Sequence, residues 1–162
     1  LAVNSQDSDS LYKRALNGGE GKYGFLDIIK NYKGTTAAKL ATYSAGMAYL
    51  NIKDYQNAIA YLDKFNSEDV LLGALAKGAI GDAFAQMGQL EEAFDYYVTA
   101  SNINNNMYST PKFLYKAAMI GSKLGKDSQA LTYLERIDKE FKESQEANMV
   151  AVQIAKLKSI LK

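Results

Sequence analysis

Apolar residues recur along the chain at three- and four-residue steps, the spacing that places them on one face of a helix. The first clear series is Ala41, Ala45, Ala48 and Ile52. The same period returns over residues 84–97. No stretch combines sustained apolar and polar alternation with turn residues at hairpin spacing, so we expect no strands. The pattern therefore predicts an all-α fold.

The helical pattern repeats with a fixed period. Gly46 and Gly81 are 35 residues apart, and so are Ala58 and Ala93. In a third copy Ala130 follows Ala93 after 37 residues, and the polar connection before Thr110 accommodates the two additional residues. One pair of helices cannot bury both of its faces, so pairs that recur at this period are expected to stack.

The residue types at the repeated positions have a steric reason. Small residues occupy the predicted crossings of the paired helices: Gly46, Gly81, Ala118, Ala58, Ala93 and Ala130. Larger side chains would force the helices apart there. In the third copy we expect a helix start at Thr110-Pro111, with Thr110 as the cap and Pro111 at the first helical position.

With these residues the sequence resembles the tetratricopeptide repeat family, whose repeat has about 34 residues. The resemblance covers residues 39–142. The family's tryptophan positions hold Thr42, Lys77 and Leu114, and Gly121 stands at the tyrosine position of the third copy. The resemblance implies a right-handed α-solenoid of stacked antiparallel helix pairs.

We expect residues 1–162 to form a single solenoid domain with three full repeats. Its parts are an N-terminal partial repeat (1–36, with helices at 7–17 and 23–33), repeats at 37–70, 71–106 and 107–142, and a capping helix at 143–162. The capping helix has an apolar stripe of Val150, Ile154, Leu157 and Leu161. A membrane-binding amphipathic helix is the alternative, but its polar face is only modestly basic and carries no aromatic anchor.

The flanking segments at 15–18, 24–29 and 31–35 are similar to those of tetratricopeptide proteins of the Bacteroidota envelope. Those proteins typically carry an N-terminal membrane anchor and resemble the ancillary translocon-associated subunit of other bacteria. The resemblance implies a location in the cell envelope, on the periplasmic side of an anchored protein; a cytoplasmic location stays open. Because the chain begins at Leu1, we expect an anchor or signal segment before it.

Composition limits the chemistry. The chain has no histidine and no cysteine, so the common metal ligands and the usual imidazole base and thiol nucleophile are missing. We expect no metal, no cofactor and no enzymatic activity. A net charge of +1 from 19 basic and 18 acidic residues gives no reason to expect nucleic acid as a partner. No apolar run is long enough for this segment to insert into a membrane.

Residues 19–24 have the spacing G-x-G-x-x-G of dinucleotide-binding loops. That motif functions between a strand and a helix, whereas a predicted helix precedes it here. We therefore expect a turn between two helices, with Asn17-Gly18 as the helix stop.

In the tetratricopeptide family the first helix of each repeat lines a concave groove. By this resemblance the groove residues are Leu40, Tyr43, Met47, Leu50, Asn51, Leu75, Gly78, Asp82, Ala85, Gln86, Lys112, Tyr115, Met119, Ser122 and Lys123. Tyrosine and methionine suit recognition surfaces, because tyrosine offers a large area at low entropy and methionine adapts its shape. The lysines and asparagines of a carboxylate clamp are largely missing.

Three hypotheses follow. The first is an interaction module whose groove takes an apolar peptide or helix of a partner protein. The second is a self-associating scaffold, possible as a homodimer, whose groove is filled by its own N-terminal helix or by a second copy. The third is an enzyme that would depend on the groove pair Asp82 and Lys123.

Overall fold

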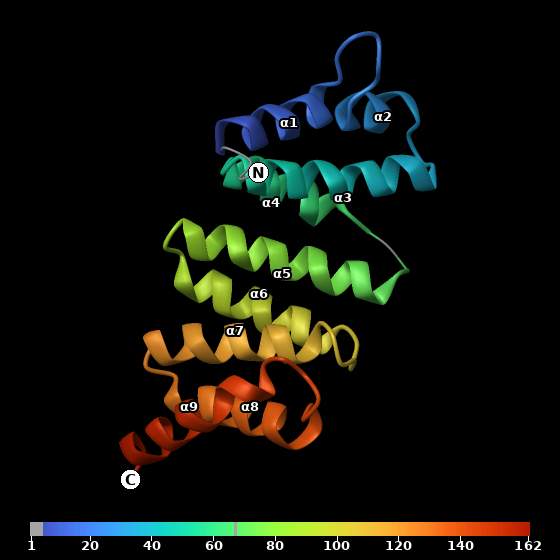
Figure 1. Cartoon of the computed structure of the whole chain (residues 1–162). Helices are drawn as coiled ribbons and strands as arrows, with labels where there is room; N and C mark the ends of the chain where they lie inside the picture. Colours follow the sequence, from blue (N-terminus) through green and yellow to red (C-terminus); the bar gives the residue numbers. More distant parts are fainter. Residues whose placement is uncertain (1–4, 67) are drawn as a thin grey trace. The chain divides into compact units, whose positions relative to one another are not determined.

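The computed structural model describes residues 5–66 and 68–162, which form α-helices α1–α9 (Figure 1). The sequence led us to expect an anchor or signal segment before Leu1. Leu1 itself lies outside the described residues. The chain divides into two compact units, Leu1–Glu68 and Asp69–Lys162. We call them the N-terminal unit and the C-terminal unit and describe each by itself.

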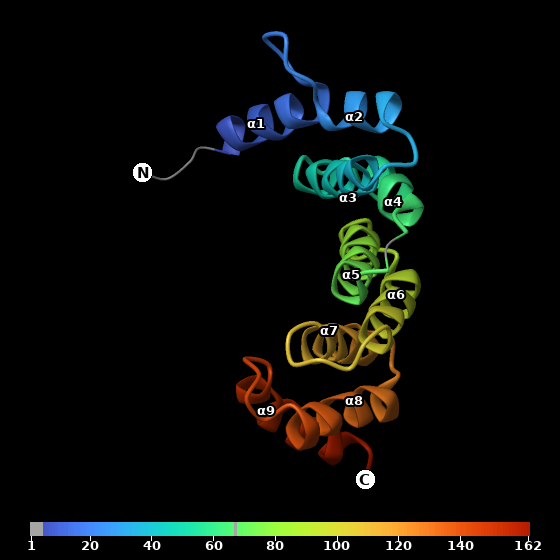
Figure 2. The same cartoon turned by 90° about the vertical axis from the view of Figure 1, so that its right-hand side faces the viewer.

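The N-terminal unit contains two helix pairs. Its helices are α1 (Ser5–Asn17), α2 (Phe25–Asn31), α3 (Thr36–Asn51) and α4 (Tyr55–Lys64). Within this unit α1 and α3 lie on one side and α2 and α4 on the other (Figure 2). Leu16 of α1 is buried against Ala45 and Ala48 of α3, and side chains of α2 cover this cluster. The unit is therefore held together by α3, which contacts all three of its neighbours.

The connection between α1 and α2 is a tight glycine-rich turn. Gly18 adopts a φ of +74°, and Gly19 and Lys22 pair through two backbone hydrogen bonds. A methyl group on Gly24 would lie 2.3 Å from the Gly18 nitrogen, so the two backbone segments approach too closely for any side chain. The turn expected at the G-x-G-x-x-G spacing is confirmed.

Close approach also determines how α3 packs on α4. A methyl group on Gly46 would lie 2.5 Å from Cγ of Leu62, a fully buried residue. The side chains that start the two helices are Thr35, whose Oγ1 accepts from the Ala38 N–H, and Asp54, whose Oδ1 accepts from the Asn57 N–H. Both satisfy N–H groups that have no partner within the helix.

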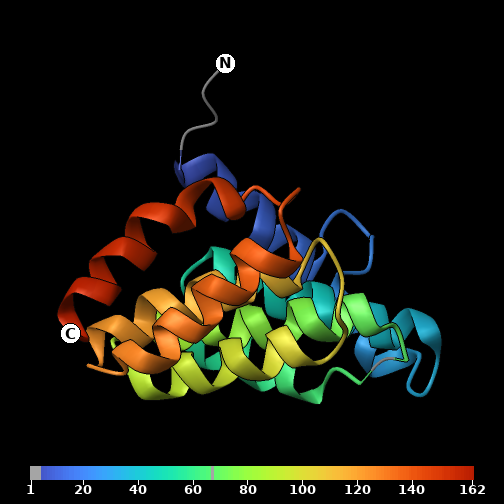
Figure 3. The ribbon, with the colours of Figure 1, turned by 90° about the horizontal axis from the view of Figure 1, so that it is seen from below.

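The C-terminal unit contains five helices: α5 (Val70–Gln86), α6 (Leu90–Asn102), α7 (Thr110–Lys123), α8 (Asp127–Glu140) and α9 (Ala147–Ile160). Consecutive helices pack on one another, and α5, α7 and α9 lie on one side with α6 and α8 on the other (Figure 2). Figure 3 shows α9 at the C-terminal end of this stack, beside α8. We call α5, α7 and α9 the inner helices and α6 and α8 the outer helices.

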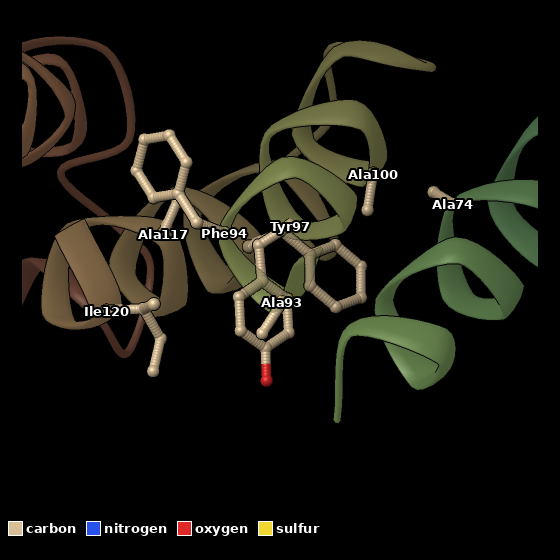
Figure 4. Packing of buried hydrophobic residues seen from close by; sticks show 8 residues of the cluster. Ala74, Ala93, Phe94, Tyr97, Ala100, Ala117 and Ile120 are labelled. Atoms are coloured by element: carbon tan, nitrogen blue, oxygen red, sulfur yellow. The ribbon is translucent and has the colours of Figure 1, made fainter. Parts of the chain in front are cut away.

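Helix α7 is buried on two faces. Phe113, Ala117 and Ile120 face α5 and α6 in a cluster that contains Tyr97 and several alanines (Figure 4). Leu114 and Ala118, one position further along, face a second cluster formed with α8 and α9. Small residues at the crossings let α6 and α8 approach α7 closely, so each pair completes the core of the next.

The connection from α6 to α7 is organised by Asn106. Its Oδ1 accepts from the N–H groups of Tyr108 and Ser109, both at 2.8 Å. Its Nδ2 donates to the Asn104 carbonyl and to Ser109 Oγ. This network fixes a loop whose Tyr108 side chain is 82% exposed.

The expected all-α fold of stacked helix pairs is confirmed. Helices α1 and α2 correspond to the helices expected at 7–17 and 23–33. Their ends differ from the expected ends by at most two residues. In α9, Val150 and Leu157 are buried as expected, but Leu161 is 45% exposed. Leu161 therefore does not continue the apolar stripe of the helix, because α9 ends at Ile160. The repeat boundaries and the single domain stay predictions.

Within the described residues, none of the helices combines the length and apolar character needed to cross a membrane.

Candidate functional site

The predicted groove residues of the N-terminal unit share one face of α3. Leu40 is 47% exposed, and Tyr43, Met47 and Leu50 are half-buried. Asn51 is exposed and donates its Nδ2 hydrogen to the Met47 carbonyl. The opposite face of α3 carries the buried alanines, so this helix buries its small side chains, while its large ones are exposed or half-buried.

Tyr43 has a packing role as well as an accessible side. The centre of its ring lies 5.2 Å from the ring centre of Phe65, a buried residue that follows α4. Burial raises the pKa of Tyr43 above its ordinary value. Replacing Tyr43 would therefore affect stability as well as binding, which makes Leu40 the better residue for testing this surface.

A small hollow of about 240 Å³ lies beside this face, between α2, α3 and the end of α4. Its walls combine apolar groups such as Ile29 with Lys33, Lys39 and Lys64. The Lys64 ammonium lies 5.5 Å from the centre of the Tyr61 ring. Sequence reasoning did not identify this hollow, because its lysines come from three separate segments.

In the C-terminal unit, several predicted groove positions on α5 are occupied by the core. Leu75 and Ala85 are half-buried against the cluster around Tyr97, and Gln86 is exposed. A methyl group on Gly78 would lie 1.9 Å from Cε1 of Phe113. The Phe113 ring therefore fills the space at Gly78, and this position offers nothing to a partner.

Asp82 is engaged in contacts within the unit. Its Oδ1 accepts a hydrogen bond of 2.7 Å from the Tyr97 hydroxyl and forms an ion pair of 2.5 Å with Lys116 Nζ. The Lys116 ammonium also lies 5.4 Å from the centre of the Tyr97 ring. Burial raises the pKa of Tyr97 most, and the hydrogen bond to Asp82 and the charge of Asp82 raise it further.

This arrangement corrects the pairing of Asp82 with Lys123 that the enzyme hypothesis required. Lys123 lies seven residues beyond Lys116 on α7, which is two turns or about 10 Å along the helix. Sequence reasoning missed Lys116, because a lysine beside a groove position normally indicates a solvated surface. In the described part of the chain, no three acidic side chains converge as a metal site would require.

The remaining predicted residues lie on α7, and three of them come together. Met119, Ser122 and Lys123 line a hollow of about 340 Å³ whose opposite wall is α9. The α9 residues in it are Gln153, Lys156, Leu157 and Ile160, and Asp127 at the start of α8 completes the lining. Tyr115 is half-buried against the α7–α9 cluster, and Lys112 is exposed with its ammonium 5.7 Å from the Phe113 ring. The helix assigned to capping is therefore also one wall of this hollow.

Charge is distributed unevenly between the inner and outer helices of the C-terminal unit. The inner helices α5, α7 and α9 contain six lysines and a single acidic residue, Asp82. The outer helices α6 and α8 contain seven acidic residues and two basic ones. The near-neutral total charge of the chain conceals this separation.

The sequence pattern of the tetratricopeptide repeat matches residues 41–69 and 74–107, which correspond to the pairs α3–α4 and α5–α6. The match ends where the third expected copy begins. Tetratricopeptide repeats commonly mediate protein–protein interaction and are typically non-catalytic. No curated protein matches the chain.

Proposed function

We propose that the chain is a non-catalytic interaction module that holds an apolar peptide or helix of a partner protein against the first helices of its repeats. The observation that carries the proposal is the pattern of burial on α3, where small side chains are buried and larger ones are not. Large side chains such as Leu40 and Met47 remain accessible, whereas Ala41, Ala45 and Ala48 are buried. A helix that served only the core would bury its large apolar side chains instead.

The chemistry of the accessible side chains supports a protein partner. Tyr43, Met47, Tyr115 and Met119 provide aromatic and thioether groups, which are frequent in recognition surfaces. The absence of histidine and cysteine from the sequence supports binding rather than catalysis. By the resemblance of the flanking segments, we further propose that the module operates in the bacterial cell envelope as part of an anchored, ancillary translocon-like protein.

The experiment is to select binders from a displayed library of short peptides and to locate their binding sites by NMR on the labelled protein. Chemical-shift changes should concentrate on α3 for a peptide held by the N-terminal unit, and on α5 and α7 for one held by the C-terminal unit. Leu40→Ser should weaken the selected peptides several-fold, because it removes an accessible apolar contact. Ile59→Ser, which also replaces an aliphatic side chain but on α4 and at a half-buried position, should not weaken them. Shift changes concentrated on α4, α6 and α8 would contradict the proposal.

A second candidate function is self-association, in which a second copy of the chain or its own N-terminal helix fills the groove. The observation that favours it is the opposite charge of the inner and outer helices of the C-terminal unit. Sedimentation velocity over a range of concentrations tests it, because a self-associating scaffold would give a dimer or larger species that dissociates on dilution.

A further inference from the structure

The hollow between α7 and α9 carries two lysines that have no carboxylate partner among the residues the structure describes. Lys123 comes from the end of α7 and Lys156 from the middle of α9. Met119, Leu157 and Ile160 provide apolar lining in the same hollow. Asp127 is also present and accepts a hydrogen bond from Ser122 Oγ at 3.2 Å. The hollow thus combines apolar contact area with a net positive charge, since two lysines outnumber one aspartate.

The surroundings of the hollow strengthen its positive character. The inner helices carry lysines almost exclusively among their charged residues. Asp82, their single acidic residue, is already neutralised by Lys116. Complementary charges direct association and select partners, and like charges across an interface are costly. A partner segment with acidic side chains would therefore be favoured here over a neutral or basic one.

We infer that the α7–α9 hollow binds an acidic amphipathic segment of a partner protein, in which aspartate or glutamate side chains flank apolar ones. The apolar side chains would contact Met119, Leu157 and Ile160, and the carboxylates would pair with Lys123 and Lys156. This inference rests on the proposed function and adds the chemistry of the partner to it.

A second copy of the chain fits the hollow less well than a separate acidic segment. The acidic residues of the outer helices are partly engaged within the unit itself. Glu91 pairs with Lys126, Glu135 with Lys158 and Glu140 with Arg136. Using them for a second copy would break existing ion pairs. An anionic membrane fits less well too, because the hollow is concave and a bilayer surface is flat.

The test uses three fluorescein-labelled amphipathic peptides of equal length and identical apolar positions. Their polar positions carry glutamate, glutamine or lysine. Fluorescence anisotropy should give the tightest binding for the glutamate peptide. Its affinity should fall as salt is raised from about 0.05 to about 0.5 M, because ion pairs at the surface are screened. The lysine peptide should bind weakest.

Two double variants localise the effect. K123E/K156E should weaken the glutamate peptide about tenfold and improve binding of the lysine peptide, because two attractions become repulsions. K33E/K39E makes the same change of charge at the hollow of the N-terminal unit. It should change the affinity less than twofold. Circular dichroism confirms that both variants fold, since all four lysines are exposed.

The outcomes separate the inference from the proposed function. Equal affinity of the glutamine and glutamate peptides, with shift changes on the inner helices, would overturn the acidic partner and leave the proposed function intact. Failure of all three peptides and of the displayed library to bind would overturn both. If K33E/K39E weakened binding of the glutamate peptide as much as K123E/K156E does, the assignment of the peptide to the α7–α9 hollow would be overturned.

Other occupants would be revealed by two further measurements. Dissociation of a wild-type dimer by K123E/K156E in sedimentation velocity would assign the hollow to a second copy and overturn the inference. Binding to phosphatidylglycerol vesicles that K123E/K156E abolishes, without binding of the glutamate peptide, would assign it to a membrane and overturn it as well. We expect a monomer that does not bind these vesicles and does bind the glutamate peptide.

Discussion

Asp82 on α5 and Lys116 on α7 form an ion pair although they are 34 residues apart in the sequence. The two residues lie on neighbouring inner helices. Tyr97, from the α6 helix, donates its hydroxyl hydrogen to the same Asp82 oxygen. A single carboxylate oxygen therefore links three consecutive helices of the C-terminal unit.

Removing this carboxylate should destabilise the fold by a modest amount. Asp82→Ala deletes both contacts, and we expect a loss of about 1 kcal/mol in the free energy of unfolding. The loss is small because the two charged side chains are 35% and 32% exposed, so water screens the ion pair. Urea denaturation followed by circular dichroism measures it.

A double-mutant cycle separates the ion pair from the hydrogen bond. Asp82→Asn keeps an oxygen that can accept from Tyr97 but loses the charge, so it should cost less than Asp82→Ala. Combined with Lys116→Met, it should give a coupling energy below about 1 kcal/mol. A coupling energy of zero would mean that the ion pair contributes nothing to stability.

The raised pKa of Tyr97 predicts a loss of stability at high pH. The folded state holds the phenol proton above the ordinary pKa of 10.0, while the unfolded chain releases it there. The stability that the raised pKa of Tyr97 gives to the folded state is therefore fully present below pH 10 and is lost as the pH rises above 10. Tyr97→Phe should be less stable than the wild type at about pH 8, because Asp82 loses its hydrogen bond. The difference in the free energy of unfolding between the wild type and Tyr97→Phe should narrow by about 1 kcal/mol at about pH 11.

Urea denaturation of both proteins across this pH range provides the measurement. Tyr43, Tyr49 and Tyr133 also have raised pKa values through burial. They are present in both proteins, so their effect cancels in the comparison. A difference that stays constant or widens with pH would show that Tyr97 ionises in the folded state.

Two glycines of α5 should respond in opposite ways to alanine. At Gly78 the new methyl group would overlap the Phe113 ring, which is buried. We expect Gly78→Ala to destabilise the protein by about 1–3 kcal/mol, the usual cost of overpacking.

At Gly73 the nearest atom would be 4.0 Å away, so the methyl group fits. Gly73→Ala should stabilise the protein by about 0.5–1 kcal/mol, because alanine restricts the unfolded chain. Thermal unfolding of the two variants under the same conditions tests the pair. Destabilisation by both would indicate a general intolerance of α5 to side chains at these positions.

Asn106 should determine the rigidity of the α6–α7 connection. Asn106→Ala leaves the Tyr108 and Ser109 N–H groups without their acceptor, and we expect a loss of about 1–2 kcal/mol. Hydrogen exchange at these two amides should accelerate. Asn102→Ala, at an exposed residue at the end of α6, is the matched control and should leave their exchange unchanged. Unaltered exchange in Asn106→Ala would mean that the loop is held by other contacts.

The sequence predicted the positions that backbone geometry dictates. Ala58, Ala93 and Ala130 were expected at helix crossings and are fully buried, because small side chains at a fixed period leave few alternatives. A helix also starts at Thr110, but its cap is Ser109 rather than the expected Thr110, so Pro111 is the second helical residue.

Positions decided by long side chains could not be predicted in the same way. Lys116 reaches Asp82 through a flexible chain, and no periodicity reveals where such a chain ends. The filling of the space at Gly78 by Phe113 depends on a ring from another helix. The α7–α9 hollow likewise depends on how α9 is placed when it packs on α8, which the spacing of its own apolar residues does not specify.

The separation of lysines and carboxylates between inner and outer helices makes the C-terminal unit an electric dipole. With a net charge of only +1, the chain as a whole would exert little electrostatic attraction on a distant charged molecule. A dipole experiences a torque near a charged molecule and rotates before contact is made. An acidic partner would therefore meet the lysine-bearing side more often than chance allows, and its association rate would depend on ionic strength despite the near-neutral total.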